Sequence, residues 1–258
     1  MARRERARDD RDFDTTQLHE SQHGQTLGRD YSGHFFRWSF ARRFINKAQN
    51  VLEVGCGQDL PLQKILLRNV GFHCNSYTGC DLNKLKPSNN QRTTLFGEFD
   101  FTTCWKEVLK TRPEGFDVAV NYEVIEHMKV EHGQKLLKAL HACLKPGGTL
   151  LLSTPVYDGV RHAANHIHEY TVPELQKYVE KAGFVVERRF GVFMDLKHIG
   201  KVEPVGAPLQ DNKNLLAAVN AVRKALGDYY DNDALSCIFA PLYPDHARNN
   251  LWVLRRKG

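Results

Sequence analysis

The chain has 258 residues, of which 41% are hydrophobic, and this suffices to build the core of one α/β domain. No apolar stretch approaches the roughly 20 residues that span a bilayer, and the beginning Met-Ala-Arg-Arg-Glu-Arg lacks the apolar segment of a secretory signal. The six cysteines form no C-x-x-C pair, so the sequence indicates neither a zinc knuckle nor a redox motif and predicts reduced thiols in a cytoplasmic protein. The net charge of +6 permits a polyanionic partner without requiring one.

The first part of the chain predicts a tail followed by one helix. Residues 1–14 alternate arginine with acidic residues, so we expect residues 1–30 to form a disordered or extended tail. An amphipathic helix is predicted from Gly33 to about Ala48. Its apolar stripe, with a spacing of four residues, consists of Phe36, Phe40 and Phe44. The basic residues that lie mostly off this stripe, on a face expected to be solvated, are Arg37, Arg42, Arg43 and Lys47.

A predicted buried strand over residues 50–54 ends in a glycine-rich turn, Glu53-Val54-Gly55-Cys56-Gly57. Gly55 and Gly57 can adopt positive φ angles, and their missing side chains let a ligand approach the backbone closely. Asp81 stands 24 positions after Gly57, at the end of the next apolar stretch. Nucleotide-binding α/β folds place there the carboxylate that holds ribose hydroxyls. We therefore expect an adenosine-containing cofactor.

The residues around the turn discriminate between cofactors. The third glycine of the dinucleotide pattern G-x-G-x-x-G is absent after Gly57, and the chain contains no G-x-x-x-x-G-K-[ST] for a nucleoside triphosphate. The carboxylate of Glu53 would repel a phosphate, whereas it suits a ligand that carries an ammonium and a sulfonium. A cationic cofactor is therefore favoured.

Five segments follow one another along the chain: Val51–Gly57, Tyr77–Asp81, Gly97–Asp100, Asn121–His127 and Leu144–Gly148. In this order they resemble the motifs of the class I S-adenosylmethionine-dependent methyltransferases, and the resemblance covers about residues 33–194. It implies an α/β fold, a Rossmann-like seven-stranded sheet that is mostly parallel, with helices on both faces and an antiparallel last strand. It also implies methyltransferase activity with S-adenosyl-L-methionine as cofactor.

The remaining pattern alternates between strands and helices, which argues for a parallel sheet with right-handed crossovers in a single domain over residues 31–258. A helix is predicted to open near Pro61, and strands are predicted to end at Asp81 and at about Phe99. The other predicted strands span 116–121, 149–154, 184–193 and 250–256, and the other predicted helices span 130–144, 173–182 and about 213–226. Residues 195–249 are expected to form an insertion that covers the substrate.

The resemblance implies a role for each matching residue. Asp81 would accept hydrogen bonds from the ribose hydroxyls, and Asp100 would accept one from the adenine amino group, although Glu98 in the same loop is an alternative. The carboxylate of Glu53 and the backbone of the two glycines would face the methionine end. The full set of expected cofactor-binding residues is Glu53, Gly55, Gly57, Asp81, Asp100, Phe101 and Asn121.

The segment Asn121–His127 also carries groups for acid–base or metal chemistry. Glu123, Glu126 and His127 stand at i, i+3 and i+4, so they could share one helical face at the mouth of the crevice. Together with His166 they offer two carboxylates and two imidazoles, a set that could hold Mg²⁺ or Mn²⁺. This set resembles the metal site of the small-RNA 3′-terminal 2′-O-methyltransferases.

The same pattern is also similar to the ubiquinone-pathway O-methyltransferases, and this is the interpretation that we favour. In that group these residues usually shape the acceptor pocket, and only some members bind metal. Without a metal, His127 and His166 are the catalytic candidates, because a neutral imidazole can act as a general base near pH 7. A divalent metal at Glu123, Glu126, His127 and His166 stays an alternative.

A nucleic acid is the less favoured acceptor. Asn121-Tyr122-Glu123-Val124 stands where DNA amino-methylating enzymes carry Asp/Asn-Pro-Pro-Tyr/Phe, and no cysteine follows a proline, as a cytosine C5 enzyme would require. The sequence therefore predicts an S-adenosylmethionine-dependent methyltransferase that acts on an oxygen, or less favourably a nitrogen, of a small molecule. The alternatives are a metal-assisted RNA 2′-O-methyltransferase and a non-catalytic scaffold, and the intact glycine turn and Asp81 argue against the scaffold.

Overall fold

The computed structural model of the chain describes residues 29–67, 72–159, 163–194, 213–226 and 237–258. The predicted tail lies outside these ranges except for residues 29 and 30. Much of the predicted insertion, residues 195–212 and 227–236, lies outside them as well. Within the described ranges, no helix is long and apolar enough to cross a membrane.

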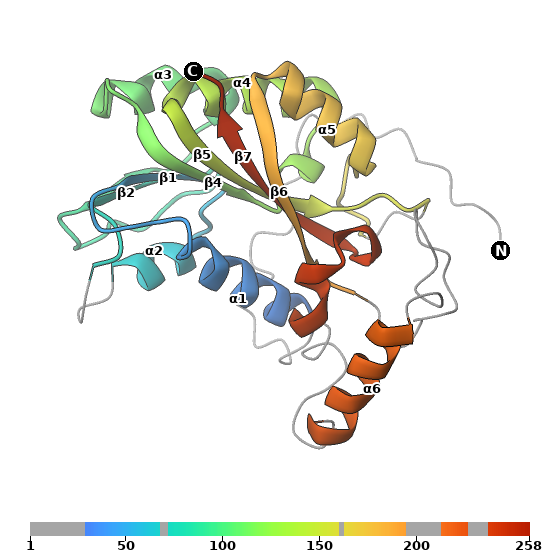
Figure 1. The fold of residues 1–258 in the computed structure, drawn as a ribbon. Helices are drawn as coiled ribbons and strands as arrows, with labels where there is room; N and C mark the ends of the chain where they lie inside the picture. Colours follow the sequence, from blue (N-terminus) through green and yellow to red (C-terminus); the bar gives the residue numbers. More distant parts are fainter. Residues whose placement is uncertain (1–28, 68–71, 160–162, 195–212, 227–236) are drawn as a thin grey trace.

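Seven strands form one sheet in the order β3-β2-β1-β4-β5-β7-β6. Their bounds are β1 Asn50–Val54, β2 Ser76–Cys80, β3 Thr93–Phe96, β4 Phe116–Tyr122, β5 Leu144–Pro155, β6 Phe184–Phe193 and β7 Asn249–Arg256. The strands β1 to β5 pair in parallel, whereas β7 lies antiparallel between β5 and β6. The predicted fold class, including the antiparallel last strand, is confirmed (Figure 1).

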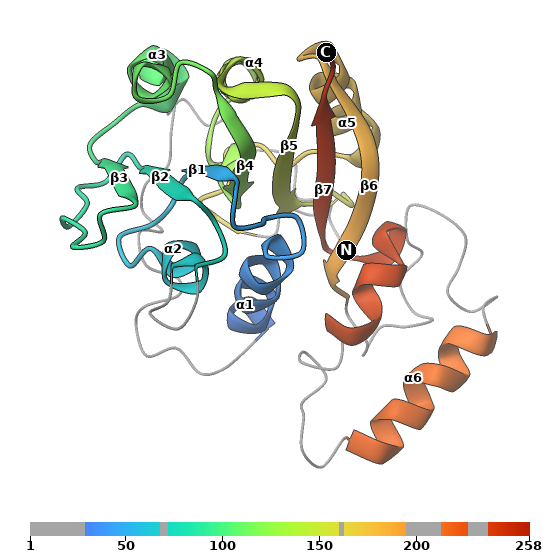
Figure 2. The same cartoon turned by 60° about the vertical axis from the view of Figure 1, so that its left-hand side comes forward.

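Helices cover both faces of the sheet (Figures 1 and 2). One face carries α1 (Arg29–Ala41) and α2 (Pro61–Leu66), and the other carries α3 (Phe101–Thr111), α4 (Val130–Cys143) and α5 (Val172–Lys181). The elements near the start of β7 are α6 (Lys213–Leu226) and two short 3₁₀ helices, η4 (Ala240–Leu242) and η5 (Pro244–His246). They share a small core in which Val219 of α6 packs with Phe239 and Ala247.

The alternation of side chains along the strands divides the main core into two layers. Leu52, Ala119 and Leu150 belong to the cluster under α3, α4 and α5, while their neighbours Val51 and Leu151 belong to the cluster under α1 and α2. Strands that are buried on both faces have largely continuous apolar sequences, and the central strands β1, β4 and β5 show this pattern. Both faces of the sheet are therefore packed against helices, and a ligand can reach the sheet at its strand ends.

The phenylalanine stripe of α1 is confirmed as core. The ring centroid of Phe40 lies 5.4 Å from that of Phe36, 5.3 Å from that of Phe44 and 4.8 Å from that of Phe190 in β6. The helix nevertheless ends at Ala41 and not near Ala48, because the N–H of Phe44 turns back to the carbonyl of Ala41 in a tight turn.

Three further expectations are wrong. Strand β3 ends at Phe96 and not near Phe99, since Glu98 adopts a φ of 53° and its N–H bonds to the carbonyl of Asn83. Strand β5 begins at Leu144 and not at residue 149, so it includes Lys145–Gly148 and follows α4 directly. Arg37 is not solvated: only 2% of its surface is exposed, because its guanidinium extends from α1 to the carboxylate of Glu123, 3.6 Å away.

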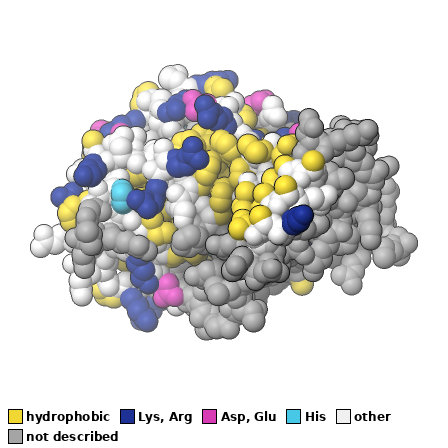
Figure 3. All heavy atoms as spheres, turned by 60° about the horizontal axis from the view of Figure 1, so that its bottom comes forward, with side chains coloured by type: hydrophobic (Ala, Val, Ile, Leu, Met, Phe, Trp, Pro, Cys, Tyr) yellow, Lys and Arg dark blue, Asp and Glu magenta, His cyan; other side chains and the backbone are white. Residues whose placement is uncertain are grey.

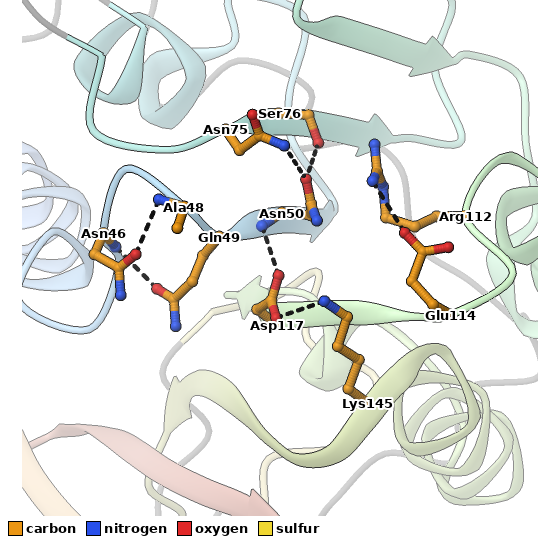
Figure 4. A network of polar contacts seen from close by, with 10 residues as sticks. All are labelled: Asn46, Ala48, Gln49, Asn50, Asn75, Ser76, Arg112, Glu114, Asp117 and Lys145. Atoms are coloured by element: carbon orange, nitrogen blue, oxygen red, sulfur yellow. Dashed lines mark hydrogen bonds and ion pairs between the residues drawn. The ribbon is translucent and has the colours of Figure 1, made fainter.

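A polar network joins the amino ends of four parallel strands (Figure 4). The carboxylate of Asp117 accepts hydrogen bonds from the backbone N–H of Asn50 and from the Lys145 ammonium, both at 2.8 Å. The side-chain oxygen of Asn50 in turn accepts bonds from Asn75 and Ser76 at 2.9 and 2.8 Å. The network therefore holds β1, β2, β4 and β5 in register at this edge.

We expect Asp117→Ala to lower the free energy of unfolding by about 2 kcal/mol, because it leaves a partly buried backbone N–H without its charged acceptor. The matched variant Lys145→Ala should cost less than about 1 kcal/mol, since 32% of the lysine side chain is exposed and solvent screens its ion pair. Urea denaturation of both variants measures the difference. Equal costs would show that the bond to Asn50 contributes nothing beyond the ion pair.

Candidate functional site

The candidate site lies at the carboxyl edge of the sheet, opposite the network of Figure 4. Strand order reverses between β1 and β4, and open α/β sheets form their ligand crevice at such a switch point. A pocket opens there, lined by residues of segments 54–57, 80–83, 99–102 and 123–128 and by Leu136. These segments follow β1, β2, β3 and β4, so the pocket is built from four consecutive strand ends.

The glycine turn after β1 has the predicted backbone. Gly55 and Gly57 have φ angles of 80° and 66°. A Cβ on Gly55 would lie 2.2 Å from Cγ2 of Val124, whereas a Cβ on Gly57 would meet no atom within 4 Å. Gly55 is thus required by packing against the segment after β4, and Gly57 leaves open space along the pocket wall.

Asp81 connects this turn to the segment after β2. One carboxylate oxygen accepts the N–H of Gly57 at 2.8 Å, and the other accepts both the backbone N–H and the side-chain amide of Asn83 at 2.9 Å. The carboxylate lines the pocket although only 9% of the residue is exposed. Sequence reasoning missed Asn83, and the spacing Asp-x-Asn was its signal, because aspartate often bonds the backbone two residues on.

Asp100 lies at the pocket as the N-cap of α3. Its carboxylate accepts hydrogen bonds from the backbone N–H of Thr102 at 2.8 Å and from the hydroxyl of Thr103 at 2.9 Å. Phe101, the first residue of the helix, also lines the pocket. Glu98 is exposed and does not line it. Of the two acids that the sequence left open, the structure brings Asp100 to the pocket.

Glu53 and Asn121 lie behind the pocket and do not line it. Only 2% of Glu53 is exposed, and its carboxyl accepts a hydrogen bond from the hydroxyl of Tyr77. Burial raises the pKa of Glu53 to about 8, the Tyr77 bond opposes this shift, and the charge of Asp81 adds to it. Asn121 is fully buried and donates to the carbonyl of Val54 at 2.9 Å, so it braces the end of β1 against β4.

Glu123 does not share a helical face with Glu126 and His127, so that expectation is wrong. Its φ angle is 54°, in the left-handed region, and the 3₁₀ helix η1 (Ile125–His127) begins only after it. The carboxylate lines the pocket and accepts hydrogen bonds from the Ser153 hydroxyl at 2.8 Å and from the Asn249 amide at 2.6 Å. The backbone turn therefore separates this acid from the other two groups.

The structure does bring Glu126, His127 and His166 together. One potential ligand atom from each lies within 4.8 Å of the others. Glu126 is fully buried; its Oε2 accepts a bond from the Thr154 hydroxyl at 3.1 Å, and its Oε1 has no hydrogen-bond partner among the described residues. Burial raises the pKa of Glu126 well above its usual range, and the negative charge of Glu123 adds to this shift.

Both imidazoles have a fixed orientation. Nδ1 of His127 lies 3.3 Å from the carbonyl oxygen of Asn165, and Nδ1 of His166 lies 2.5 Å from the carboxylate of Glu169, which is 2% exposed. These oxygens only accept, so each Nδ1 donates and each neutral ring keeps its lone pair on Nε2. The ring centroids are 5.0 Å apart. The arrangement can take up a proton or ligate a metal.

Of the basic residues predicted around the first helix, Arg37 reaches Glu123 at the pocket, whereas Arg42, which follows α1, lies away from it. Figure 3 shows the face that carries α1 and α2, with lysine and arginine side chains around a broad hydrophobic area. Arg42 is exposed and lies 2.7 Å from Nε2 of His73, just before β2 begins. Because β2 starts at the amino edge of the sheet, this part of the basic face lies at the edge opposite the pocket.

The comparisons with known proteins agree on one family of enzymes. A family model described as a methyltransferase domain matches residues 33–188. A probable S-adenosylmethionine-dependent methyltransferase of Mycolicibacterium smegmatis is 29% identical over 197 residues, which cover 68% of this chain and 72% of that relative. A tRNA U34 carboxymethyltransferase of Pseudomonas fluorescens is 28% identical over 178 residues, which cover 62% of this chain and 53%, or about half, of that relative.

A solved structure shows the same fold. The crystal structure of an S-adenosylmethionine-dependent methyltransferase from Archaeoglobus fulgidus matches with a TM-score of 0.54 at 15% identity. The match covers 88% of this chain and 94% of that one. At this identity the likeness establishes the fold alone.

Proposed function

Because the chain belongs to the class I S-adenosylmethionine-dependent methyltransferases, we propose that it transfers the methyl group to an oxygen of a hydroxyl-bearing small molecule. The observation that supports an oxygen acceptor is the pair of oriented imidazoles, His127 and His166, beside the pocket. S-adenosylmethionine supplies an electrophilic methyl group on its sulfonium. The protein therefore has to orient the reactants, exclude water and receive the hydroxyl proton.

The residues at the pocket fit this cofactor. In the proposed binding mode Asp81 accepts hydrogen bonds from the ribose hydroxyls, and Asp100 and the backbone of Phe101 lie beside the adenine. The open side of Gly57 admits the methionine end close to the backbone. Glu53 acts from behind the turn as an electrostatic partner of the cofactor's ammonium, and Asn121 supports the turn through Val54.

The proposed proton path begins at His127, which lines the pocket. Nε2 of His127 would accept the hydroxyl proton as the acceptor oxygen takes the methyl group, and the cofactor, having lost that group, would leave as a neutral thioether. His166, oriented by the buried carboxylate of Glu169, lies next to His127 and stabilises the resulting imidazolium. The proton then leaves to solvent.

A second candidate function is supported by the unpartnered Oε1 of Glu126 close to the two imidazoles. Glu126, His127 and His166 would hold Mg²⁺ or Mn²⁺, and Nδ1 of each imidazole already has the outer acceptor that metal-binding histidines usually show. Such a cation would supply Lewis-acid orientation of acceptor hydroxyls, as an RNA terminus offers. The tRNA-modifying relative favours keeping this candidate, whereas the position of Arg42 at the opposite edge of the sheet favours the small molecule.

The experiment that separates the two candidates follows radiolabelled methyl from S-adenosylmethionine into an extract of the source organism, with and without EDTA. Label in the small-molecule fraction that survives EDTA is the expected result. Label in RNA that is lost with EDTA and restored by Mn²⁺ would replace the first proposal with the second. Absence of label, despite measured binding of S-adenosylhomocysteine, would contradict both.

His127→Asn and His166→Ala are each expected to lower kcat about 100- to 10,000-fold. The first removes the base for the acceptor hydroxyl, and the second removes the group that stabilises this base once it is protonated. Both should bind S-adenosylhomocysteine as tightly as the parent chain, measured by calorimetry. His73→Gln, which changes a half-buried histidine at the opposite edge, is the matched control. Unchanged kcat in both site variants would remove the imidazoles from the mechanism.

A further inference from the structure

Asn249, the first residue of β7, contacts the pocket residue Glu123, which stands 126 positions earlier in the sequence. Its side-chain amide donates to Oε2 of Glu123 at 2.6 Å, and 6% of the residue is exposed. This is the only hydrogen bond that Oε2 receives among the described residues. The backbone of Asn249 is paired on both sides, with Pro155 of β5 and Phe193 of β6, so its side chain projects from a fixed base.

The carboxylate of Glu123 is held from three other elements as well as by its own strand end. Oε1 accepts the Ser153 hydroxyl of β5 at 2.8 Å and lies 3.6 Å from the guanidinium of Arg37 in α1. The backbone N–H of Glu123 donates to the carbonyl of Ser153 at 3.0 Å. Asn249 completes this set from β7, so the carboxylate has little freedom to reorient.

This fixation matters because the backbone at Glu123 is strained. A non-glycine residue at a φ of 54° costs on the order of 1 kcal/mol and persists only where its surroundings determine it. The turn at Glu123 directs the next residue, Val124, against Gly55 of the cofactor turn and starts η1, which ends in His127. The conformation of one residue therefore sets both the pocket wall and the position of the imidazole.

We propose that Asn249 is a positioning residue for methyl transfer. By holding Oε2 of Glu123 it stabilises the left-handed turn and thereby places His127 at the pocket, without itself lining the pocket. The inference rests on the proposed function, since it requires His127 to act in the transfer. It also gives the antiparallel strand β7 a part in the reaction beyond completing the sheet.

Asn249→Asp tests the proposal, because it keeps the side-chain shape but turns a donor into a second carboxylate that faces Glu123. We expect kcat to fall at least 10-fold, with KM and the Kd for S-adenosylhomocysteine changed less than twofold. Asn46→Asp, an exposed residue at the amino edge whose side chain keeps its acceptor oxygen, is the charge-matched control and should leave kcat unchanged. Asn249→Ala removes the bond without adding charge and replaces the aspartate variant if that variant does not fold.

The double variant Glu123→Gln/Asn249→Asp reverses the amide–carboxylate pair and should recover at least part of the lost kcat. A merely structural role predicts no such recovery, so a double variant no better than Asn249→Asp would overturn the proposal. Ring-proton NMR of His127, assigned by His127→Asn, gives a readout that needs no acceptor: its signal should move in Asn249→Asp while that of His73 stays. An unmoved His127 signal would overturn the positioning role alone. Absence of methyl transfer by the parent chain to a hydroxyl-bearing acceptor would instead overturn the proposed function.

Discussion

Replacement of Asp81 by alanine is expected to weaken the binding of S-adenosylhomocysteine at least 100-fold. The variant removes the proposed acceptor of the ribose hydroxyls and also the carboxylate that holds the N–H of Gly57. A hydrogen bond to a charged group contributes about 1.5–3 kcal/mol, and each 1.4 kcal/mol is a factor of ten in affinity. Loss of two such bonds therefore exceeds two orders of magnitude, and isothermal calorimetry measures it directly.

Two variants make the Asp81 result specific. Asp81→Asn keeps an oxygen for the Gly57 N–H but lacks the charge, so its affinity should lie between those of the parent and the alanine variant. Asp59→Ala removes an exposed acid from the same turn and should bind like the parent chain. If Asp81→Ala bound as tightly as Asp59→Ala, Asp81 would have no part in holding the cofactor.

Replacement of Glu53 by glutamine is expected to stabilise the cofactor-free protein at pH 8 and to change it little at pH 5. Burial raises the pKa of Glu53 from 4.5 to about 8, so the folded chain keeps a proton that the unfolded chain releases. This carboxyl therefore favours folding below pH 4.5, and its contribution is lost as the pH rises towards 8. Linkage gives a difference of about 3 kcal/mol between pH 5 and pH 8, and the neutral amide removes it.

Urea denaturation of both proteins at the two pH values measures this effect. The opposite consequence is expected for the cofactor: its ammonium should draw the proton from Glu53, so binding at pH 7 releases protons in the parent chain and fewer in Glu53→Gln. Calorimetry in buffers of different ionisation enthalpy counts these protons. Parallel stability profiles of the two proteins between pH 5 and pH 8 would show that Glu53 is ionised in the free protein.

The cofactor side of the site could be predicted from sequence because its signals are local. Gly55 and Gly57 can be recognised as turn residues because their own positive φ angles favour glycine. Asp81 can be recognised because it directly follows the apolar run that forms a strand. The carboxyl ends of adjacent parallel strands meet at one edge, so the spacing alone brings these residues together. The order of strands and helices followed from the same alternation.

The acceptor side could be predicted only in part. The pattern Glu126-His127 with a distant His166 identified groups that the structure does bring together. The pattern could not show that Glu123 leaves the helical path, because its left-handed φ depends on donors from other elements. Arg37 and Asn249 contact it from 86 and 126 positions away, and no local periodicity encodes such contacts. Arg37 was expected in solvent for the same reason.

The placement of β7 between β5 and β6 has a consequence for how the protein gains activity as it folds. The strands that carry the cofactor residues, β1 to β4, lie within about 70 positions of one another, whereas β7 must find β5 from about 100 positions away. Pairing over such distances is slow, because the loop-closure entropy is lost before the contacts form. A refolding chain would thus regain affinity for its cofactor before it regains catalysis, and would pass through a state that holds the methyl donor without an ordered site for its acceptor.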